Sequence, residues 1–136
     1  MIVSRTPLRV SFCGGGSDLE AYYSKSEEGG RVTSVALNKY VYVTVNSRFD
    51  DSVRVSYSEM EIVDNFENLN HQLVKEAMRM TGVTKGVEIT TIADIPSKGS
   101  GLGSSSSVTV GLLHALHCFP GRSPNPKQLA EEACKI

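Results

Sequence analysis

A run of glycine and serine residues between two apolar segments constrains the fold of this chain more than any other feature. Residues 96–107 contain three glycines and six serines. The β-branched segment 87–93 precedes this run, and segment 108–116, which reads as a helix, follows it. A linker would separate two complete domains, whereas here apolar segments abut the run on both sides. The sequence therefore predicts a strand, a glycine-rich loop and the N-terminus of a helix.

This loop has the chemistry of an anion-binding site. Glycine lets the backbone curl tightly and leaves no side chain between its N–H groups and a ligand. The first turn of a helix adds N–H donors without partners and the positive end of the helix dipole. Together these features favour a phosphate site. A serine hydroxyl at the end of the loop could also reach a metal ion that bridges phosphates.

Two well-known phosphate loops do not match. A Walker A loop would need a lysine followed by serine or threonine, and no lysine follows Gly103. A dinucleotide-binding loop would need the spacing G-x-G-x-x-G, and the glycines of residues 99–103 are spaced differently. The loop is therefore of another kind.

The N-terminal segment predicts a second glycine turn after a strand. Residues 6–13 read as a strand that ends in a glycine-rich turn at Gly14. Asp18 provides a carboxylate just after this turn. Arg9 places a fixed charge inside the strand, and such a charge requires a partner if it is buried. One interpretation is a structural Arg9–Asp18 ion pair around a plain turn. The other is a ligand site that works with the phosphate loop.

At these residues the chain resembles a known family, the GHMP kinases, named for galactokinase, homoserine kinase, mevalonate kinase and phosphomevalonate kinase. The Gly-Leu-Gly-Ser-Ser-Ser-Ser end of residues 96–107 is similar to the family's second motif, a loop that wraps the phosphates of ATP. The resemblance implies that Ser105 helps to hold Mg²⁺. The residues implied in ATP binding are Lys98, Gly99, Ser100, Gly101, Leu102, Gly103, Ser104, Ser105 and Ser106.

The N-terminal segment resembles the family's first motif. Pro7 and Arg9 match its proline and cation, and Leu8 replaces the usual glycine. Two glycines replace a Glu-His pair, a variant that looks most like the heptose 7-phosphate kinase and fucokinase-type branch. The resemblance implies a catalytic role for Arg9, which would stabilise charge on the transferring phosphoryl group. The residues implied in substrate binding are Gly14, Gly15, Gly16, Ser17 and Asp18.

The function that this resemblance implies is ATP-dependent phosphorylation of a sugar or sugar phosphate, with heptose 7-phosphate at its anomeric hydroxyl as the first candidate. One alternative is a kinase for another small alcohol, of the mevalonate or homoserine type. A second is a non-catalytic anion-binding domain, because family members continue with a Mg²⁺-binding glutamate and a catalytic aspartate. We expect residues 1–136 to form a single domain, the N-terminal ATP-binding domain. The C-terminal domain is expected to be absent, and the isolated chain inactive.

Composition limits the partners. The chain has 136 residues and a formal net charge of −1, which gives no broad basic surface for nucleic acid or anionic membrane. No apolar stretch approaches the ~20 residues of a membrane span. An odd count of three cysteines and no leader-like segment favour reduced thiols and a cytoplasmic protein. Homo-oligomer formation is left open.

The pattern along the chain predicts an α+β fold. Turn residues Asn38 and Lys39 predict a two-residue hairpin between strands at 31–37 and 40–48. Leu69 opens a helical periodicity that Gly82 ends, and Asn125 and its successors have a helix-capping pattern. The remaining elements are strands at 53–57 and 87–93 and helices at about 104–118 and from 126 onward. We expect a mostly antiparallel or mixed sheet covered by helices on one face, as in the family's ribosomal protein S5 domain 2-like N-terminal domain.

Overall fold

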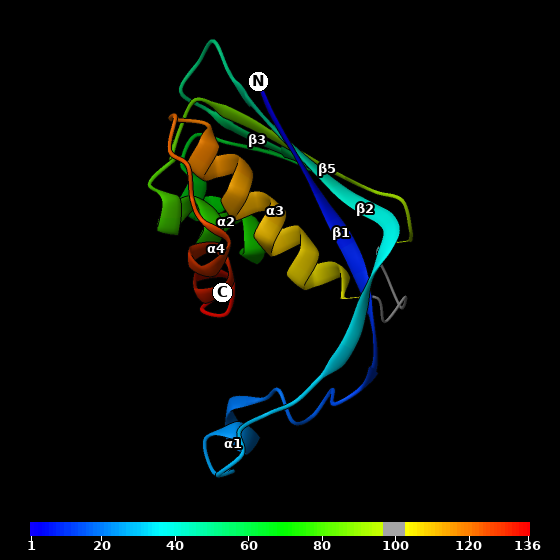
Figure 1. The fold of residues 1–136 in the computed structure, drawn as a ribbon. Helices are drawn as coiled ribbons and strands as arrows, with labels where there is room; N and C mark the ends of the chain where they lie inside the picture. The colour runs from blue at the N-terminus through cyan, green and yellow to red at the C-terminus, as the bar shows by residue number, and fades with distance from the viewer. Residues whose placement is uncertain (97–102) are drawn as a thin grey trace.

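The computed structural model describes residues 1–96 and 103–136. It contains a five-stranded mixed sheet with helices packed on one face (Figure 1). The strand order is β1-β2-β5-β3-β4, in which only the β3–β5 pair is parallel. The expected α+β class, with helices on one face of the sheet, is confirmed. The strands are β1 (Ile2–Cys13), β2 (Thr33–Ser47), β3 (Val53–Ser56), β4 (Met60–Val63) and β5 (Val87–Ala93).

The helices differ in length and in how they are capped. Gly82 ends α2 in the left-handed conformation, with a φ of 71°, as the sequence predicts. Asn125 caps α4 by accepting a hydrogen bond from the backbone N–H of Gln128 at 2.8 Å. The helices are α1 (Glu20–Tyr23), a short 3-10 helix η1 (Phe66–Asn68), α2 (Gln72–Thr81), α3 (Ser104–Cys118) and α4 (Pro126–Ala133). None of the described helices has both the length and the hydropathy needed to cross a membrane.

The core lies between the sheet and the helices. In β2, the side chains of Val41, Val43 and Val45 point inward and are buried, while the intervening residues are only partly buried. This alternation is the period-2 pattern of a strand that is covered on one face. Leu112 and Leu116 of α3 are fully buried against this face. Apolar burial of this kind is the main stabilising term of the domain.

Gly111 lets α3 approach the sheet closely. A Cβ at Gly111 would lie 3.0 Å from the hydroxyl of Thr6 and 3.1 Å from a methyl group of Val43. The hydroxyl of Ser4 donates a hydrogen bond to the carbonyl of Gly111 at 2.8 Å. Near the start of the helix, Ser107 donates to the carbonyl of Pro7 at 3.1 Å. These contacts fix the position of α3 along β1 and β2.

The predicted hairpin at Asn38 and Lys39 is wrong, because β2 runs without a break from Thr33 to Ser47. From Thr33 to Val45, β2 pairs with the long strand β1, and the register shifts between Pro7 and Arg9. At this point three residues of β2, between Ala36 and Tyr40, face a single residue of β1. The turn-forming residues therefore form a bulge rather than a turn. Pairing of both halves with the same neighbour keeps the strand extended.

Four further elements differ from the sequence-based expectations. Strand β4 and the short helices α1 and η1 were not predicted. Leu69, expected to open a helix, is buried in the core before α2 begins at Gln72. The buried face of α2 is formed by Val74, Ala77, Met78 and Thr81. The periodicity therefore predicted the right helix, but the helix begins three residues after Leu69.

Beyond the body of the domain, β1 and β2 continue as a two-stranded arm, residues 10–36, that carries α1 (Figure 1). The part of β2 that pairs with β5 is Val41–Ser47, which lies outside the arm, so the arm has no third strand. Helix α1 contains no buried residue. Six large apolar side chains of the arm are exposed: Phe12, Leu19, Tyr22, Tyr23, Val32 and Val35. The arm is therefore stabilised by little beyond its own strand pairing.

We predict that Gly111→Val lowers the free energy of unfolding by about 2 kcal/mol, because its branched side chain would push α3 away from β1 and β2. Gly111→Ala should stay within about 1 kcal/mol of the wild type, since a gain in helix propensity offsets the tight contact with Thr6. Urea denaturation of the three proteins measures the difference. A Val variant as stable as the wild type would show that close packing at Gly111 does not hold the helix.

Candidate functional site

The N-terminus of α3 presents backbone donors that no side chain caps. Gly103 precedes the helix in the left-handed conformation, with a φ of 64°, and makes no side-chain cap bond. The first intrahelical bond runs from the N–H of Ser107 to the carbonyl of Gly103 at 3.1 Å. The N–H groups of residues 104–106 therefore have no partner within the helix. No acidic residue lies in the first turn, so the positive end of the helix is open to an anion.

The serines at this helix end divide into two groups. Ser106 donates its hydroxyl to the carbonyl of Gly103 at 3.0 Å, and Ser107 is buried and bonded to Pro7. The hydroxyls of Ser104 and Ser105 line a pocket and make no hydrogen bond to any described residue. These two hydroxyls are therefore available to a ligand, whereas the next two serve the fold.

Arg9 lies against the same helix end. A Cβ at Gly103 would lie 3.3 Å from Cγ of Arg9 and 3.5 Å from its Nε. The Arg9 guanidinium donates a hydrogen bond to the Ser11 hydroxyl. No carboxylate in the described ranges forms an ion pair with Arg9, so the expected alternative of an Arg9–Asp18 pair is absent from the described structure. The structure thus brings a free cation beside the uncapped helix end.

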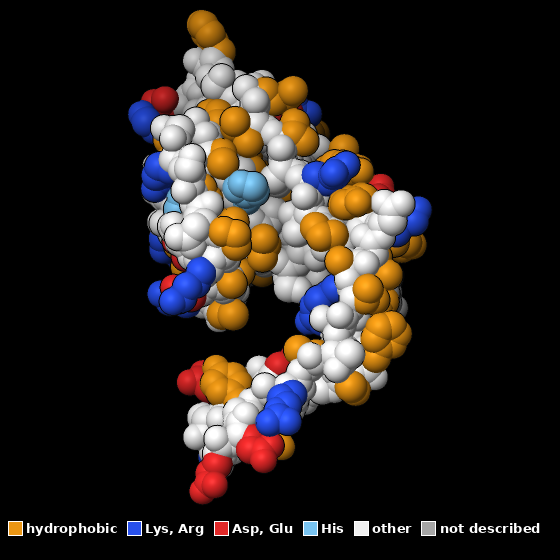
Figure 2. Space-filling model, viewed as in Figure 1, with side chains coloured by type: hydrophobic (Ala, Val, Ile, Leu, Met, Phe, Trp, Pro, Cys, Tyr) orange, Lys and Arg blue, Asp and Glu red, His pale blue; other side chains and the backbone are white. Residues whose placement is uncertain are grey.

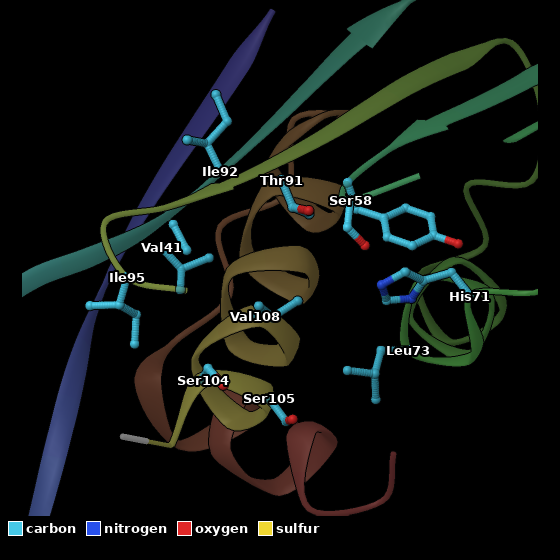
Figure 3. A pocket seen from close by; sticks show the side chains of 12 residues that line it. Val41, Ser58, His71, Leu73, Thr91, Ile92, Ile95, Ser104, Ser105 and Val108 are labelled. Carbon is cyan, nitrogen blue, oxygen red and sulfur yellow. The ribbon is translucent and has the colours of Figure 1, made fainter. Parts of the chain in front are cut away.

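A pocket of about 450 Å³ opens beside the first turn of α3 (Figure 3). Its walls come from β5 and the residues after it, from the start of α2, from the β3–β4 turn and from α3. The exposed surface of the lining is mostly apolar, although six of the lining residues carry a hydroxyl or imidazole group. The lining residues are Val41, Tyr57, Ser58, His71, Leu73, Thr91, Ile92, Ala93, Ile95, Ser104, Ser105 and Val108. A concave apolar pocket with a few convergent polar groups is the usual form of a small-molecule site.

A hydrogen-bond network holds one wall of this pocket. Glu61 accepts bonds from the hydroxyl of Tyr57 at 2.9 Å, from the N–H of Asn70 at 2.7 Å and from the N–H of His71 at 3.2 Å. Burial alone would raise the pKa of Glu61, but these donors outweigh burial and lower it. The hydrogen bond to Glu61, followed by burial, raises the pKa of Tyr57 to about 12. Glu61 is therefore ionised and Tyr57 protonated at neutral pH.

His71 is packed into the same wall. Its ring lies edge-on to the ring of Tyr57, with centroids 4.6 Å apart and an interplanar angle of 86°. Its Nδ1 caps α2 by accepting a bond from the N–H of Val74 at 3.4 Å. Burial lowers the pKa of His71, although the Glu61 carboxylate opposes this shift. The imidazole is therefore neutral at pH 7.

The arm carries the predicted substrate residues. Gly14 has a φ of 93°, and a Cβ there would lie 2.1 Å from the carbonyl oxygen of Arg31, so only glycine fits. The hydroxyl of Ser17 lies 3.0 Å from the carbonyl oxygen of Gly14 and 2.5 Å from that of Arg31. Ser17 therefore joins the two sides of the arm. In contrast, nothing lies within 4 Å of the Cβ positions of Gly15 and Gly16.

Asp18 is exposed on the arm and has no hydrogen-bond or ion-pair partner among the described residues. The arm curves below the body and leaves a wide opening between the two (Figure 2). The structure thus brings Arg9 to the helix end but leaves Asp18 on the far side of this opening. The predicted loop residues Lys98, Gly99, Ser100, Gly101 and Leu102 lie outside the described residues.

The sequence did not reveal the apolar pocket or its Tyr57–His71 wall. These residues lie on the β3–β4 turn and at the start of α2, far along the chain from the glycine-rich loop. The available signal was the β-branched residues of β5 together with Ile95, which comes just before the loop. That signal places apolar side chains beside the loop but does not identify the opposite wall.

The fold and this helix end define a class, an α+β domain in which helix α3, packed on the sheet, begins with an uncapped N-terminus. Residues 68–136 match the family model described as the GHMP kinases N terminal domain. The chain belongs to the GHMP kinase family. The matched segment contains α2, β5, α3 and α4, and so includes the helix end and part of the pocket.

Individual relatives agree with the family. The chain is 32% identical over 129 residues to the D-glycero-alpha-D-manno-heptose 7-phosphate kinase of Campylobacter jejuni, covering 84% of this chain and 36% of that protein. The chain thus spans about a third of that relative's length.

Solved structures show the same fold. The crystal structure of a D-glycero-D-manno-heptose 1-phosphate kinase from Bacteroides thetaiotaomicron superposes with a TM-score of 0.83 at 25% identity, covering 99% of this chain and 47% of that one. Lactococcus lactis galactokinase superposes with a TM-score of 0.76 at 22% identity, covering 98% and 37%. The second comparison shows similarity of fold only.

We predict that the free energy of unfolding falls as the pH is lowered from 7.5 to 5, in part through His71. The pKa of His71 in the folded protein is below the ordinary 6.5, so the unfolded chain takes up a proton at a higher pH than the folded protein does. Lowering the pH through this range therefore stabilises the unfolded state relative to the folded state. Glu61 also contributes to the free energy of unfolding, but this contribution is lost only at more acidic pH, because the pKa of Glu61 is lowered from the ordinary value of 4.5. His71→Asn should flatten this part of the profile in urea denaturation. His114 and His117 remain in both proteins, so an unchanged profile would contradict the role of His71.

Proposed function

We propose that this chain supplies the ATP-binding domain of a kinase that phosphorylates a sugar or sugar phosphate. The observation that carries the proposal is the uncapped N-terminus of α3, which opens onto an apolar pocket and has Arg9 beside it. An uncapped helix end joined to a largely apolar pocket suits a nucleotide, which combines phosphates with a planar base. Membership of the GHMP kinase family supports ATP as that nucleotide.

In this proposal the phosphates of ATP occupy the helix end. The free N–H groups of residues 104–106 would donate to phosphate oxygens, and the helix dipole would favour their charge. Ser104 and Ser105 lie on the first turn of α3, and both line the same pocket (Figure 3). The left-handed Gly103 lets the backbone enter the helix without a side chain between the donors and the phosphates.

The base would occupy the apolar part of the pocket. Ile95 and Val41 form one wall, Val108 the floor, and Leu73 with His71 the opposite side (Figure 3). A purine is planar and largely apolar on its faces, so burial between such walls is favourable. A volume of about 450 Å³ is within the range of small-molecule sites.

Mg²⁺ would be held mainly by the phosphates. Within residues 1–96 and 103–136, no group of three or more His, Cys, Asp or Glu side chains could hold a metal ion. Mg²⁺ commonly keeps waters and phosphate oxygens as ligands and takes few from the protein. The exposed hydroxyl of Ser105 fits as the ligand that this chain would add. The ion would neutralise charge on the phosphates during transfer.

Arg9 would stabilise the transferring phosphoryl group. A new bond forms between phosphorus and a sugar oxygen as the bond from phosphorus to ADP breaks. Catalysis of this step depends mostly on positioning and on neutralising charge. A guanidinium beside the helix end, free of any described carboxylate, is placed for that task. The proton of the sugar hydroxyl must also leave, and we assign no residue of this chain to that transfer.

The arm would bind the sugar. Asp18 is exposed and free to accept hydrogen bonds from two neighbouring hydroxyls, a pattern that suits a sugar. The open space at Gly15 and Gly16 admits a large substrate or a second phosphate. Heptose 7-phosphate, phosphorylated at the anomeric hydroxyl, is the substrate that this geometry and the named activity of the Campylobacter jejuni relative support best.

We predict that Gly103→Val lowers the affinity of the chain for ATP at least tenfold, because a side chain would both strain the backbone and contact Arg9. Gly121→Val is the matched control, since Gly121 also has a positive φ, of 91°, and lies just beyond the other end of α3. Isothermal titration calorimetry with ATP measures both. Absence of ATP binding to the wild-type chain would refute the proposed function, and equal losses in both variants would remove the phosphate role of Gly103.

We predict that Asp18→Asn lowers kcat/KM for the sugar substrate by about one to two powers of ten and leaves the affinity for ATP unchanged. A charge-assisted hydrogen bond is worth roughly 1.5–3 kcal/mol, and about 1.4 kcal/mol corresponds to a tenfold change. A coupled ADP-release assay with heptose 7-phosphate, on a form of the protein that turns the substrate over, measures the effect. The exposed Asp64, changed to Asn, is the control. A loss of ATP affinity with unchanged sugar kinetics would place Asp18 in the nucleotide site instead.

A further inference from the structure

Three interactions fix the position of His71, and one of its ring nitrogens, Nε2, has no hydrogen-bond partner among the described residues. Its backbone N–H donates to Glu61, its Nδ1 accepts from the N–H of Val74, and its ring packs edge-on against Tyr57. Tyr57 is itself fixed through its hydroxyl to Glu61. The ring therefore has a defined orientation before any ligand arrives. A pre-oriented group loses little conformational entropy when it binds a ligand.

The cap on α2 also sets the tautomer of this ring. Nδ1 accepts a hydrogen bond from a backbone N–H, so it carries no proton in the neutral ring. The single ring proton must then lie on Nε2. Burial keeps the ring neutral by lowering its pKa. Nε2 is thus an uncharged hydrogen-bond donor.

This donor faces the pocket. Figure 3 shows the His71 ring projecting from the start of α2 toward the space between α3 and β5. No described residue forms a hydrogen bond with Nε2. The pocket lining includes the hydroxyl groups of Ser58, Thr91, Ser104 and Ser105, and none of them is hydrogen-bonded to this nitrogen in the described structure. A donor so placed is satisfied only by water or by a ligand.

The surroundings favour a neutral acceptor over a phosphate. Phosphate charge is matched at the other part of the pocket, by the helix N-terminus and Arg9. A neutral imidazole between apolar walls adds no charge, so it matches an uncharged ring nitrogen better than an anion. A purine presents such nitrogens at its edge.

We propose that His71 recognises the nucleotide base by donating a hydrogen bond from Nε2 to one ring nitrogen of the purine, while Nδ1 of the same ring caps α2. This assignment rests on the proposed function, in which ATP binds in the pocket. One side chain then links the folding of α2 to the selection of the base.

His71→Asn separates the two roles of this side chain. The oxygen Oδ1 of asparagine occupies the same place along the side chain as Nδ1, and asparagine is among the best N-cap residues. The shorter side chain ends before the position of Nε2. The variant should therefore keep the cap and the stability of α2 but lose the donor in the pocket. Ser58→Ala is the matched control, because Ser58 lines the same pocket without capping a helix.

The experiment measures affinities for ATP and for its 1-deaza, 3-deaza and 7-deaza analogues, in each of which one ring nitrogen is replaced by C–H. Wild-type protein should bind one of the three analogues about three- to tenfold more weakly than ATP, the range expected for one neutral hydrogen bond. His71→Asn should bind ATP and that analogue equally well. Ser58→Ala should keep the wild-type discrimination. Thermal unfolding should give the Asn variant a midpoint close to that of the wild type.

Several outcomes would overturn the proposal. If the wild type binds ATP and all three analogues equally, no ring nitrogen is recognised, and this result does not depend on any variant. If His71→Asn keeps the discrimination, or Ser58→Ala loses it, the donor is another residue. In these cases ATP binding itself, and with it the proposed function, would stand. If wild-type protein does not bind ATP, the proposed function and this inference fail together.

Discussion

The close packing of α3 on β1 and β2 is the constraint on which the rest of the structure depends. The missing side chain at Gly111 and the bonds from Ser4 and Ser107 fix both the depth and the axial position of the helix. Its middle is buried as part of the core, while its first turn projects at the end of the sheet. One helix therefore supplies both core packing and the unpaired backbone donors of the proposed site. A shift of the helix would move the donors relative to Arg9, which is anchored on β1.

The sequence predicted those features that depend on local chemistry. Gly103, the helix that follows it and the strand before the loop are all determined by neighbouring residues, and the structure agrees. The prediction of a hairpin at Asn38 was wrong because the local sequence is compatible with both a turn and a bulge in a continuous strand. Only the length of β1, which pairs with β2 on both sides of that point, decides that the strand continues. This information lies in β1, far from Asn38 along the chain, and leaves no local trace in the sequence around Asn38.

The candidate site was likewise predicted only in the parts that depend on local sequence. Arg9 was selected for its unusual place in a strand, and the structure brings it to the helix end. The wall formed by Tyr57 and His71 was missed because neither residue belongs to a motif. The position of each residue in the pocket depends on tertiary contacts. The sequence can suggest that a histidine caps a helix, but it does not show that the other ring nitrogen faces a pocket. Patterns in sequence reveal backbone-based sites more readily than sites built from side chains of separate elements.

The two-stranded arm has a consequence for how such proteins diversify. Helix α1 buries nothing, and most arm side chains are exposed, so replacing them removes few contacts from the core. The residues of the body have no such freedom, because each is packed against several others. Selection can therefore change the residues of the arm with little loss of folding stability, while the helix end and its pocket stay fixed. Under the proposed function, this division would let one scaffold acquire new phosphoryl acceptors while the phosphoryl donor stays the same.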